Sequence, residues 1–420
     1  MKIQINDPVL GWVNAADIYF DANKEVTIEY DVEYASKHLG EKGCRALSIN
    51  LPVSLDYPNY RGEFPGFMTD LIPQGKSLKK VLARYNIDSE NSFEQILRQV
   101  PLASPGNLRI FEAWEEIEIE RPSYKQSGFE LKDLIERSDG FIDYMLESSA
   151  PIGGTTGAQG GAPKFLLRRD VKGMFHADGF LEDSLTDECF MIKFPIDAAD
   201  NSVEINKTEK IFYDYLLKSQ LTTHKIMNVY GGILFCRRFD RVRSTSDKLL
   251  HYHGLETVYS LMERNTFASS LYHEDIMMKL SLHSSSPAQD LIEYLCRDVI
   301  NQAFKNSDNH GRNTSIIKYS DGTIRLSPVY DVAPMKLFKG DHITELTTWK
   351  SGNECLENRI EWLANLVNQK PDEIKRNIRW LIGFLGEVSV NIKKENLDKQ
   401  FREKISESTN KQIQLLKEVL

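Results

Sequence analysis

Several features that would assign a chain to a well-known class are missing from this sequence. No run of apolar residues is long enough to span a bilayer, and residues 1–7 contain no apolar signal-peptide core. The five cysteines are odd in number and widely scattered, and they form no C-x-x-C metal site. We therefore expect a protein of the reducing cytoplasm that does not enter a membrane.

An excess of positive charge is also absent. The formal net charge is −9, whereas a surface that binds nucleic-acid backbones broadly needs clustered Lys and Arg. The hydrophobic share of 41% and the charged share of 27% are typical of a soluble globular protein. A length of 420 residues exceeds one compact core and predicts two or three domains.

Composition and periodicity divide the chain into three parts. Residues 1–120 alternate short strand-like runs with turns and carry no catalytic set, so we interpret them as an accessory domain. Residues 125–240 hold a glycine-rich stretch, strands and a helix, and we interpret them as a small lobe. Residues 241–420 are mostly of helical pattern and would form a C-terminal lobe.

Local patterns in the first part predict individual elements. Residues 26–30 alternate as a strand does, and residues 46–51 are expected to form another strand. The acidic, proline-containing stretch 115–124 is typical of a linker to the next domain.

The most informative stretch is residues 306–313 together with Asp331. Asp308 and Asn313 have the spacing D-x-x-x-x-N of a protein-kinase catalytic loop. The Asp-Gly pair at 321–322, between β-branched runs, predicts a hairpin, and a two-residue turn would return Asp331 opposite Arg312. Two acids and one amide would then converge to hold Mg²⁺ and orient a hydroxyl group. Alternatively, Asp308 caps a helix or turn and Asp331 merely follows a strand.

A glycine-rich stretch at 151–164 lies upstream. Five glycines in nine positions keep side chains away and let backbone N–H groups point at an anion. No G-K-[ST] closes the stretch, so it is not a Walker A loop. A flexible loop without a ligand is the alternative interpretation.

Lys193 lies within an apolar strand at 190–195. A lysine in such a run needs a partner, because burying an unpaired ammonium group is costly. A nucleotide phosphate could serve, as could Glu209, which shares a helix face with Phe212 and Tyr213. The alternative is an edge-strand lysine that reaches water, with Glu209 solvated.

The order of these parts favours one fold. The parts follow one another as they do in a two-lobed kinase. They are a glycine-rich loop, a strand lysine, a helix glutamate, a hairpin that turns at 231–232, a helix, the D-x-x-x-x-N pattern and a final acid. We therefore predict an α+β protein with a protein-kinase-like fold, an additional N-terminal β-rich domain and a helical C-terminal lobe.

The same stretches resemble the HipA-type serine/threonine kinases, which are toxins of bacterial toxin–antitoxin pairs. The resemblance covers most of the chain, and residues 308–331 are its most specific part. The matching segments are Gly157-Ala158-Gln159 with Lys164, then 192–195, 238–241, 308–313 and 326–331, while 67–73 resembles the family's N-terminal module.

This resemblance implies ATP and Mg²⁺ as cofactors and a protein hydroxyl as acceptor; family members act on aminoacyl-tRNA synthetases. It also implies a helix-turn-helix antitoxin through which DNA is contacted only indirectly. Asp308 would orient or deprotonate the acceptor hydroxyl, and Asn313 and Asp331 would hold Mg²⁺. Lys193 would contact the α/β-phosphates, with Glu209 as its pairing acid. The other implied ATP-binding positions are Thr156, Gly157, Ala158, Gln159, Lys164, Arg237, Arg238, Phe239, His310, Gly311, Arg312 and Tyr330.

The sequence departs from the family pattern in three places. Gly154 stands where relatives often carry an autophosphorylated serine, so Thr155 or Thr156 would have to take over such control. Residues 160–163 are inserted before Lys164, and residues 253–256 replace the Pro-Gln-Glu-Asp segment of the family. The last two differences favour altered substrate recognition over lost activity, because the metal and base positions are intact.

Three functions fit these residues. The first is an active protein kinase. The second is a degenerate kinase that binds a DNA-binding antitoxin and serves as a corepressor. The third is a kinase that acts on a small-molecule or lipid hydroxyl. Nucleotide binding without a product would separate the second from the others.

Overall fold

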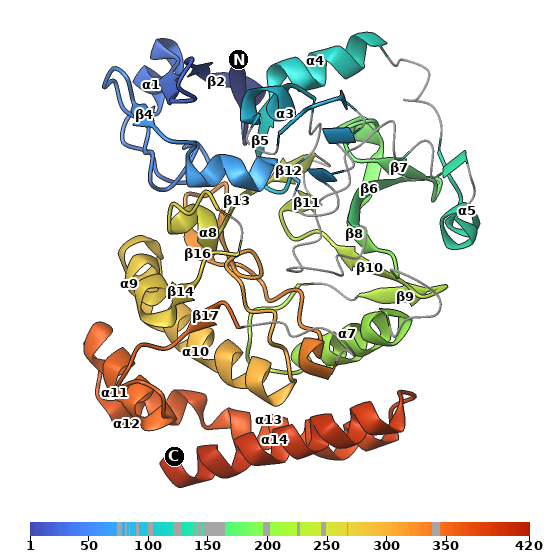
Figure 1. The fold of residues 1–420 in the computed structure, drawn as a ribbon, viewed down its shortest axis with the longest axis vertical. Coiled ribbons are helices and arrows are strands. Elements are labelled where there is room, and N and C mark those ends of the chain that lie inside the picture. The colour runs from blue at the N-terminus through green and yellow to red at the C-terminus, as the bar shows by residue number, and fades with distance from the viewer. Residues whose placement is uncertain are drawn as a thin grey trace. The chain divides into compact units, whose positions relative to one another are not determined.

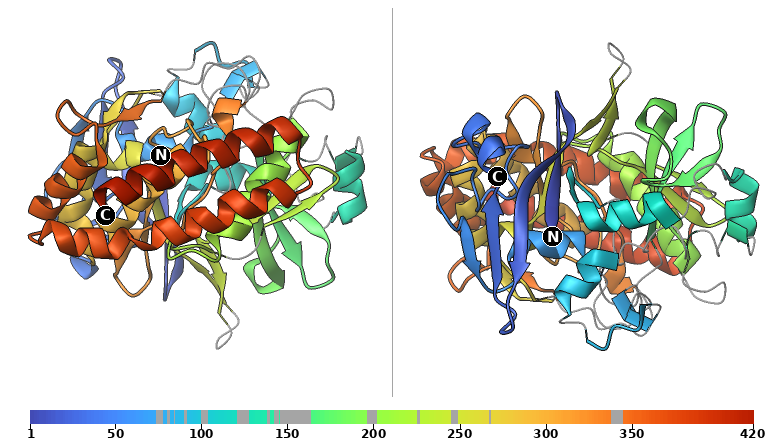
Figure 2. Two further views of the ribbon diagram at one scale, coloured as in Figure 1. Left: turned by 90° about the horizontal axis from the view of Figure 1, so that it is seen from below. Right: turned by 90° about the horizontal axis from the view of Figure 1, so that it is seen from above.

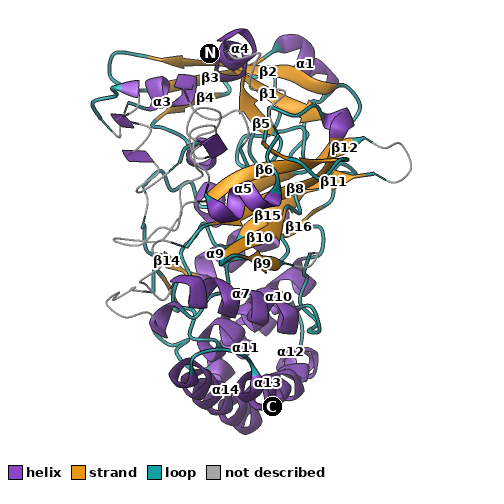
Figure 3. Cartoon of the chain, turned by 90° about the vertical axis from the view of Figure 1, so that its right-hand side faces the viewer, coloured by secondary structure: helices purple, strands orange, loops and turns teal. Residues whose placement is uncertain are grey.

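The computed structural model forms two compact units that interleave along the sequence. The first comprises Met1–Ile196, Phe235–Phe267 and Ile316–Ile324, and the second Asp197–Leu234, Ala268–Ser315 and Arg325–Leu420. The first carries most of the strands and the second most of the helices (Figure 3). The three-domain division predicted above stays a prediction. The structure describes the chain except residues 74–77, 80–81, 84, 90–91, 100–103, 121–127, 138–139, 142–144, 146–163, 196–201, 225–226, 245–248, 267 and 338–344.

The N-terminal part of the first unit is built on a five-stranded sheet with the order β4-β3-β2-β1-β5 (Figure 1). Alternation places Val26, Ile28 and Tyr30 of β3 in the core, as a half-buried strand requires. This confirms the strand predicted at 26–30. The elements are β1 (Lys2–Asp7), β2 (Gly11–Phe20), β3 (Val26–Tyr30), α1 (Val32–Lys37), β4 (Tyr60–Gly62), η1 (Gly66–Leu71), α3 (Phe93–Gln99), β5 (Leu108–Ile110) and α4 (Phe111–Glu120).

The strand predicted at 46–51 does not form. Only an isolated bridge joins Ser48 and Leu51 there. The buried carboxylate of Glu256 accepts hydrogen bonds from the Ile49 backbone N–H and from Ser48 Oγ, both at 2.8 Å. A distant side chain therefore takes the place of a neighbouring strand.

The linker predicted at 115–124 is also wrong over its first half. Residues up to Glu120 belong to the helix α4. Glutamate is a good helix former, and no proline interrupts the chain before Pro122. The acidic residues up to Glu120 therefore belong to a helix rather than to a linker.

A second sheet of the first unit orders its strands β7-β6-β8 and continues to β10. In the antiparallel pairing of β6 with β8, Lys164 lies opposite Lys193. The elements of this part are α5 (Leu131–Glu136), β6 (Lys164–Asp170), β7 (Phe175–Ala177), η3 (Asp183–Leu185), β8 (Thr186–Lys193), β10 (Ile233–Arg237), β11 (Arg241–Arg243), β12 (Leu250–Tyr252), β13 (Gly254–Thr257), α8 (Val258–Leu261), β15 (Ser315–Lys318) and β16 (Ile324–Leu326).

Glu256 connects these two parts of the first unit. Besides Ser48 and Ile49, it accepts hydrogen bonds from Ser260 Oγ at 2.8 Å and Lys318 Nζ at 2.7 Å. Burial alone would raise the pKa of this carboxyl, but the Lys318 charge and these hydrogen bonds lower it. Glu256 is therefore ionised in the folded protein at neutral pH.

The hairpin β15–β16 forms, but its turn is longer by one residue than predicted. Tyr319 N donates to Thr323 O at 2.9 Å, and Ser327 N donates to Ser315 O at 2.9 Å. Gly322 has φ +89, as in three-residue hairpin loops that end in a left-handed glycine. The extra residue shifts the register, so the predicted placement of Asp331 opposite Arg312 is wrong.

The second unit is mainly helical. Leu291, Leu295 and Val299 of α10 are buried on one stripe, as predicted. Helices α13 and α14 pack side by side, and Ser389 Oγ of α13 donates to Asn410 Oδ1 of α14 at 2.9 Å (Figure 2). The elements are α7 (Ser202–Leu216), β9 (Asn228–Tyr230), β14 (Leu271–Tyr272), α9 (His273–His283), α10 (Pro287–Ala303), η4 (Met335–Leu337), β17 (Thr347–Thr348), α11 (Leu356–Leu366), α12 (Pro371–Ile378), α13 (Trp380–Asn391), η5 (Ile392–Lys394) and α14 (Lys399–Val419). Among the described residues, no helix combines the length and apolar character needed to cross a membrane.

Candidate active site

The loop that follows α10 brings the predicted metal and base residues to one cavity in the second unit. Asp308, Asn313 and Asp331 line this cavity of about 40 Å³, which we call the Asp308 cavity. Its wall also includes Asn306 from the same loop and Tyr330 from the returning segment. Asp331 still reaches this cavity although the hairpin register is shifted, because it lies beyond the end of the strand and adopts φ 56.

Asp308 is oriented by its neighbours in the loop. Its backbone N–H donates to Asn306 Oδ1 at 3.2 Å, and its Oδ1 lies 3.2 Å from His310 Nε2. The other ring nitrogen, Nδ1, accepts the Arg312 backbone N–H at 3.2 Å. That bond leaves the ring proton on Nε2, so neutral His310 donates to the Asp308 carboxylate.

The two predicted metal residues are held through main-chain bonds. Asn313 Nδ2 donates to Asp308 O at 2.8 Å, which fixes the direction of the Asn313 amide oxygen. Asn306 Nδ2 lies 3.4 Å from Asp331 O, so Asn306 contacts both Asp308 and Asp331. Carboxylate and amide oxygens are the ligands that Mg²⁺ prefers, and the donor set therefore fits this ion.

No cluster of three or more His, Cys, Asp and Glu side chains occurs among the described residues. A dedicated zinc or thiolate site is therefore absent from this part of the chain. Mg²⁺ keeps several waters and commonly takes one or two carboxylates besides phosphate oxygens, so such a sparse set is sufficient.

Two side chains position this loop: Asn309, which was not predicted, and Tyr330, whose predicted contact with ATP stays a prediction. Asn309 clamps β17: its Nδ2 donates to Thr347 O at 2.8 Å, and its Oδ1 accepts Leu346 N at 3.1 Å and Thr347 N at 3.2 Å. Thr347 Oγ1 in turn donates to Asn309 O at 2.6 Å. Tyr330 OH donates to Arg312 O at 2.6 Å. The run of asparagines in 306–313 is the sequence signal, because Asn side chains bond readily to nearby backbone.

The predicted phosphate-binding lysines lie side by side in the first unit. Lys164 and Lys193 are buried register partners on β6 and β8. Whether these lysines contact nucleotide phosphates stays a prediction. Glu209 is buried on α7 of the second unit. Its pairing with Lys193 stays a prediction.

In the segment predicted to lie beside adenine, the side chain of Arg238 takes part in a buried ion network. Arg238 donates to Asp240 Oδ1 at 2.9 Å and pairs with Asp178, so its guanidinium belongs to a buried ion network. Arg237 pairs with Glu188 on the neighbouring strand β8. Phe239 follows as a half-buried residue. Whether these residues contact a nucleotide stays a prediction.

The glycine-rich stretch lies outside the described residues. This holds for Gly154, Thr155 and Thr156 and for Gly157, Ala158 and Gln159, as well as for the inserted segment 160–163. Their predicted roles in ATP binding and autophosphorylation stay predictions. His310, Gly311 and Arg312 belong to the described loop, where His310 supports Asp308 as described above.

Comparison with known families and structures identifies the family and the fold of this chain. A model described as the HipA N-terminal domain matches residues 11–111, and one described as the HipA-like C-terminal domain matches residues 156–383. The solved HipA of the Shewanella oneidensis MR-1 toxin–antitoxin system, in complex with HipB and its operator DNA, has a TM-score of 0.62 and 13% identity and covers 99% of this chain and 96% of its own. This likeness confirms the predicted fold.

A second solved structure gives a weaker match. The Helicobacter pylori proinflammatory kinase CtkA has a TM-score of 0.36 and 12% identity, over 63% of this chain and 93% of its own. At that score the match adds no weight to the fold assignment. A comparison with curated proteins finds no match.

Proposed function

This chain belongs to the HipA family, and we propose that it is an ATP- and Mg²⁺-dependent serine/threonine protein kinase that acts as the toxin of a toxin–antitoxin pair. One observation carries the proposal: Asp308, Asn313 and Asp331 line a single cavity. Protein kinases use an acid, an amide and a second acid in these roles.

Asp308 would take the proton of the acceptor hydroxyl or hold that hydroxyl in line for attack. The hydrogen bond from His310 Nε2 supports this role because it fixes the plane of the carboxylate. A neutral donor also leaves the negative charge on Asp308, as an acceptor of a hydroxyl proton requires.

Oxygen ligands would hold the Mg²⁺ ion of the nucleotide, and lysine ammonium groups would hold its phosphates. Asn313 and Asp331 offer oxygen ligands, and the bound Mg²⁺ would neutralise charge that develops on the transferred phosphoryl group. Lys164 and Lys193, which are register partners on β6 and β8, would donate charge-assisted hydrogen bonds to the phosphates. Positioning and electrostatic stabilisation then supply most of the rate increase.

We infer a helix-turn-helix antitoxin as partner, because the Shewanella HipA was solved together with HipB and its operator DNA. Contact with DNA would occur only through the antitoxin, in agreement with a net charge of −9. An aminoacyl-tRNA synthetase is the first acceptor to test.

The test is transfer of labelled phosphate from ATP, in a cell lysate and to a purified synthetase. Asp308→Asn should fold normally and lower transfer by at least about a hundredfold, the usual scale for removing a key catalytic group. Ser307→Ala is the matched control beside it. Wild-type transfer by Asp308→Asn would refute the assigned role. If the wild type binds ATP but yields no labelled product, the corepressor function replaces the kinase.

A further inference from the structure

The first unit contains a larger cavity that the proposed kinase function does not use. Its volume is about 180 Å³, and Trp12, Arg109, Trp114, Phe180, Arg168 and Tyr252 are among its lining residues. We call it the tryptophan–arginine cavity. Its residues come from β2, β5, α4, β6, β12 and the loop before η3, and all belong to one compact unit.

The strand order of the N-terminal sheet builds one wall. β2 and β5 flank β1, so Trp12 pairs with Asn6 and Arg109 pairs with Gln4 on the same face of β1. Arg109 Nε donates to Gln4 Oε1 at 2.8 Å, which fixes the guanidinium in place. Trp114, one turn into α4, then covers the guanidinium from the other side.

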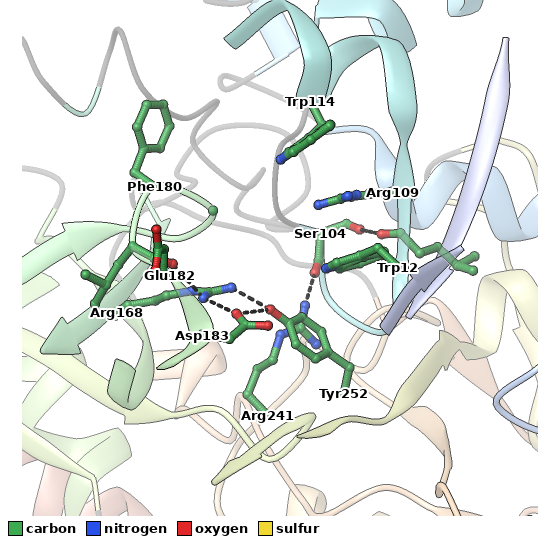
Figure 4. Close-up of a pocket in the computed structure, with 13 residues that line it drawn as sticks. Trp12, Ser104, Arg109, Trp114, Arg168, Phe180, Glu182, Asp183, Arg241 and Tyr252 are labelled. Atoms are coloured by element: carbon green, nitrogen blue, oxygen red, sulfur yellow. Dashed lines mark hydrogen bonds and ion pairs between the residues drawn. The ribbon is translucent and has the colours of Figure 1, made fainter. Parts of the chain in front are cut away.

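The result is a stack of indole, guanidinium and indole. The Arg109 guanidinium carbon lies 4.1 Å from the Trp12 ring centroid and 4.4 Å from that of Trp114. Figure 4 shows the nitrogen ends of all three side chains pointing the same way, towards the side of Phe180. Neither indole N–H makes a hydrogen bond within the described part of the chain. This wall therefore presents donors and a positive charge.

Hydrogen bonds among Arg168, Tyr252 and Asp183 hold the floor of the cavity in place. Arg168 Nη2 donates to Tyr252 OH at 2.6 Å, and Tyr252 OH donates to Asp183 Oδ1 at 2.7 Å (Figure 4). Arg168 Nη1 also donates to Leu181 O at 2.9 Å. Because these groups satisfy one another, they form a rigid support that needs no ligand. The cavity is preformed, and recognition falls to the donor wall.

From this arrangement we propose that the tryptophan–arginine cavity binds a small aromatic carboxylate. A negative acceptor group matches the two indole N–H groups and the Arg109 charge, because charge-assisted hydrogen bonds are the strong ones. The buried ring of Phe180 lies across from them and suits an apolar body. The exposed carboxylate of Glu182 also lines the cavity and disfavours a doubly charged phosphate.

Benzoate is the probe, and isothermal titration calorimetry of the full chain is the measurement. Benzoate should bind saturably, whereas benzyl alcohol, which lacks the charge, should not. Trp114→Phe keeps an aromatic ring over Arg109 but removes one N–H, and should weaken binding about tenfold. Arg109→Gln should weaken it by at least about tenfold. If Arg109→Gln fails to fold, Trp114→Phe decides alone.

Two controls separate this site from the rest of the molecule. Trp380→Phe, in α13 and outside the cavity, should leave benzoate affinity unchanged. Asp308→Asn should do the same, since Asp308 lines the other cavity. The proposal is overturned if benzoate does not bind saturably, if Trp114→Phe binds as the wild type does, or if phenyl phosphate binds more tightly than benzoate.

Discussion

The two cavities of this protein hold buried acids in different ways. Beside the tryptophan–arginine cavity, guanidinium groups contact the acids: Asp178 pairs with Arg168 and Arg238, and Asp240 pairs with Arg238 and Arg241. In the Asp308 cavity, the imidazole of His310 donates to Asp308. Asp178 and Asp240 are thus paired with arginines of their own unit, whereas Asp308 is oriented by a hydrogen bond from an imidazole.

The pairing with arginines lowers the pKa of Asp178 and of Asp240. Burial alone would raise the pKa of Asp240, but the charges of Arg238 and Arg241 lower it to about 2. Burial likewise opposes ionisation of Asp178, and the charges of Arg168 and Arg238 outweigh it, so its pKa lies below the usual range. Both acids are therefore ionised, and their charges serve to hold the buried arginines.

The largest expected effect is on stability, at Asp178. Asp178→Asn would leave Arg168 and Arg238 buried without their shared counter-charge. Breaking such a pair typically lowers the free energy of unfolding by about 3–5 kcal/mol. Urea denaturation followed by circular dichroism measures the change. Glu94→Gln, at the exposed pair with Arg98, is the matched control and should change it by less than about 1 kcal/mol.

If Asp178→Asn lowers the free energy of unfolding by less than about 1 kcal/mol, the proposed difference between the two cavities is wrong. The buried network would then contribute no more than an exposed ion pair, and the two cavities would not differ in what their acids do.

Acid pH should destabilise the fold for the same reason. The unfolded pKa of an aspartate is about 3.9, and the folded pKa of Asp240 is about 2. A lowered folded pKa gives stability that is present above pH 4 and is lost as pH falls towards 2. Asp240 alone would contribute about 3 kcal/mol. Urea midpoints measured at pH 7, 4 and 2 check this.

Glu256→Gln sharpens the same experiment. The pKa of Glu256 is also lowered, so its replacement should reduce stability at pH 7 and make the decline towards pH 2 shallower. A wild type whose unfolding free energy stays constant between pH 4 and pH 2 would contradict the assignment of these acids to stability.

The two cavities also differ in what the sequence could reveal. Asp308 and Asn313 were predicted because a short loop fixes their spacing, and a hairpin brings Asp331 back along the chain. The register was missed by one residue because the left-handed conformation of Gly322 completes a longer turn. The ion network escaped prediction because Arg168, Asp178 and Arg238 meet only through the pairing of distant strands. The stack of Trp12, Arg109 and Trp114 escaped for the same reason, since it depends on β1 lying between β2 and β5.

A smaller effect is expected at Asn309, and it concerns rate rather than stability. Asn309→Ala removes the bonds to Leu346 and Thr347 that hold the loop carrying Asp308. Misplacing a catalytic group by a fraction of an ångström costs about tenfold to a hundredfold in kcat. The KM for ATP should change less than kcat, because the side-chain hydrogen bonds of Asn309 go to Leu346 and Thr347 and not to Asn313 or Asp331. Steady-state kinetics at varied ATP concentrations measures the effects on kcat and on KM separately.

Asn265→Ala serves as the control for that variant, since its amide donates only to Glu63 at the protein surface. It should match the wild type in kcat and KM. If Asn309→Ala lowers stability as well as kcat and also raises the KM for ATP, the hydrogen bonds of Asn309 only maintain the fold.

The smallest effect is expected at Ser307, directly beside Asp308. Its side chain is fully buried, yet Oγ has no hydrogen-bond partner within the described part of the chain. Removing a buried hydroxyl that makes no hydrogen bond relieves its desolvation, so Ser307→Ala should be neutral or stabilise by up to about 1 kcal/mol. Transfer should match the wild type. Thermal denaturation and the labelled-ATP assay check both, and a fall in transfer with unchanged stability would mean that Ser307 acts in the reaction and that the Asp308 cavity holds a further catalytic group.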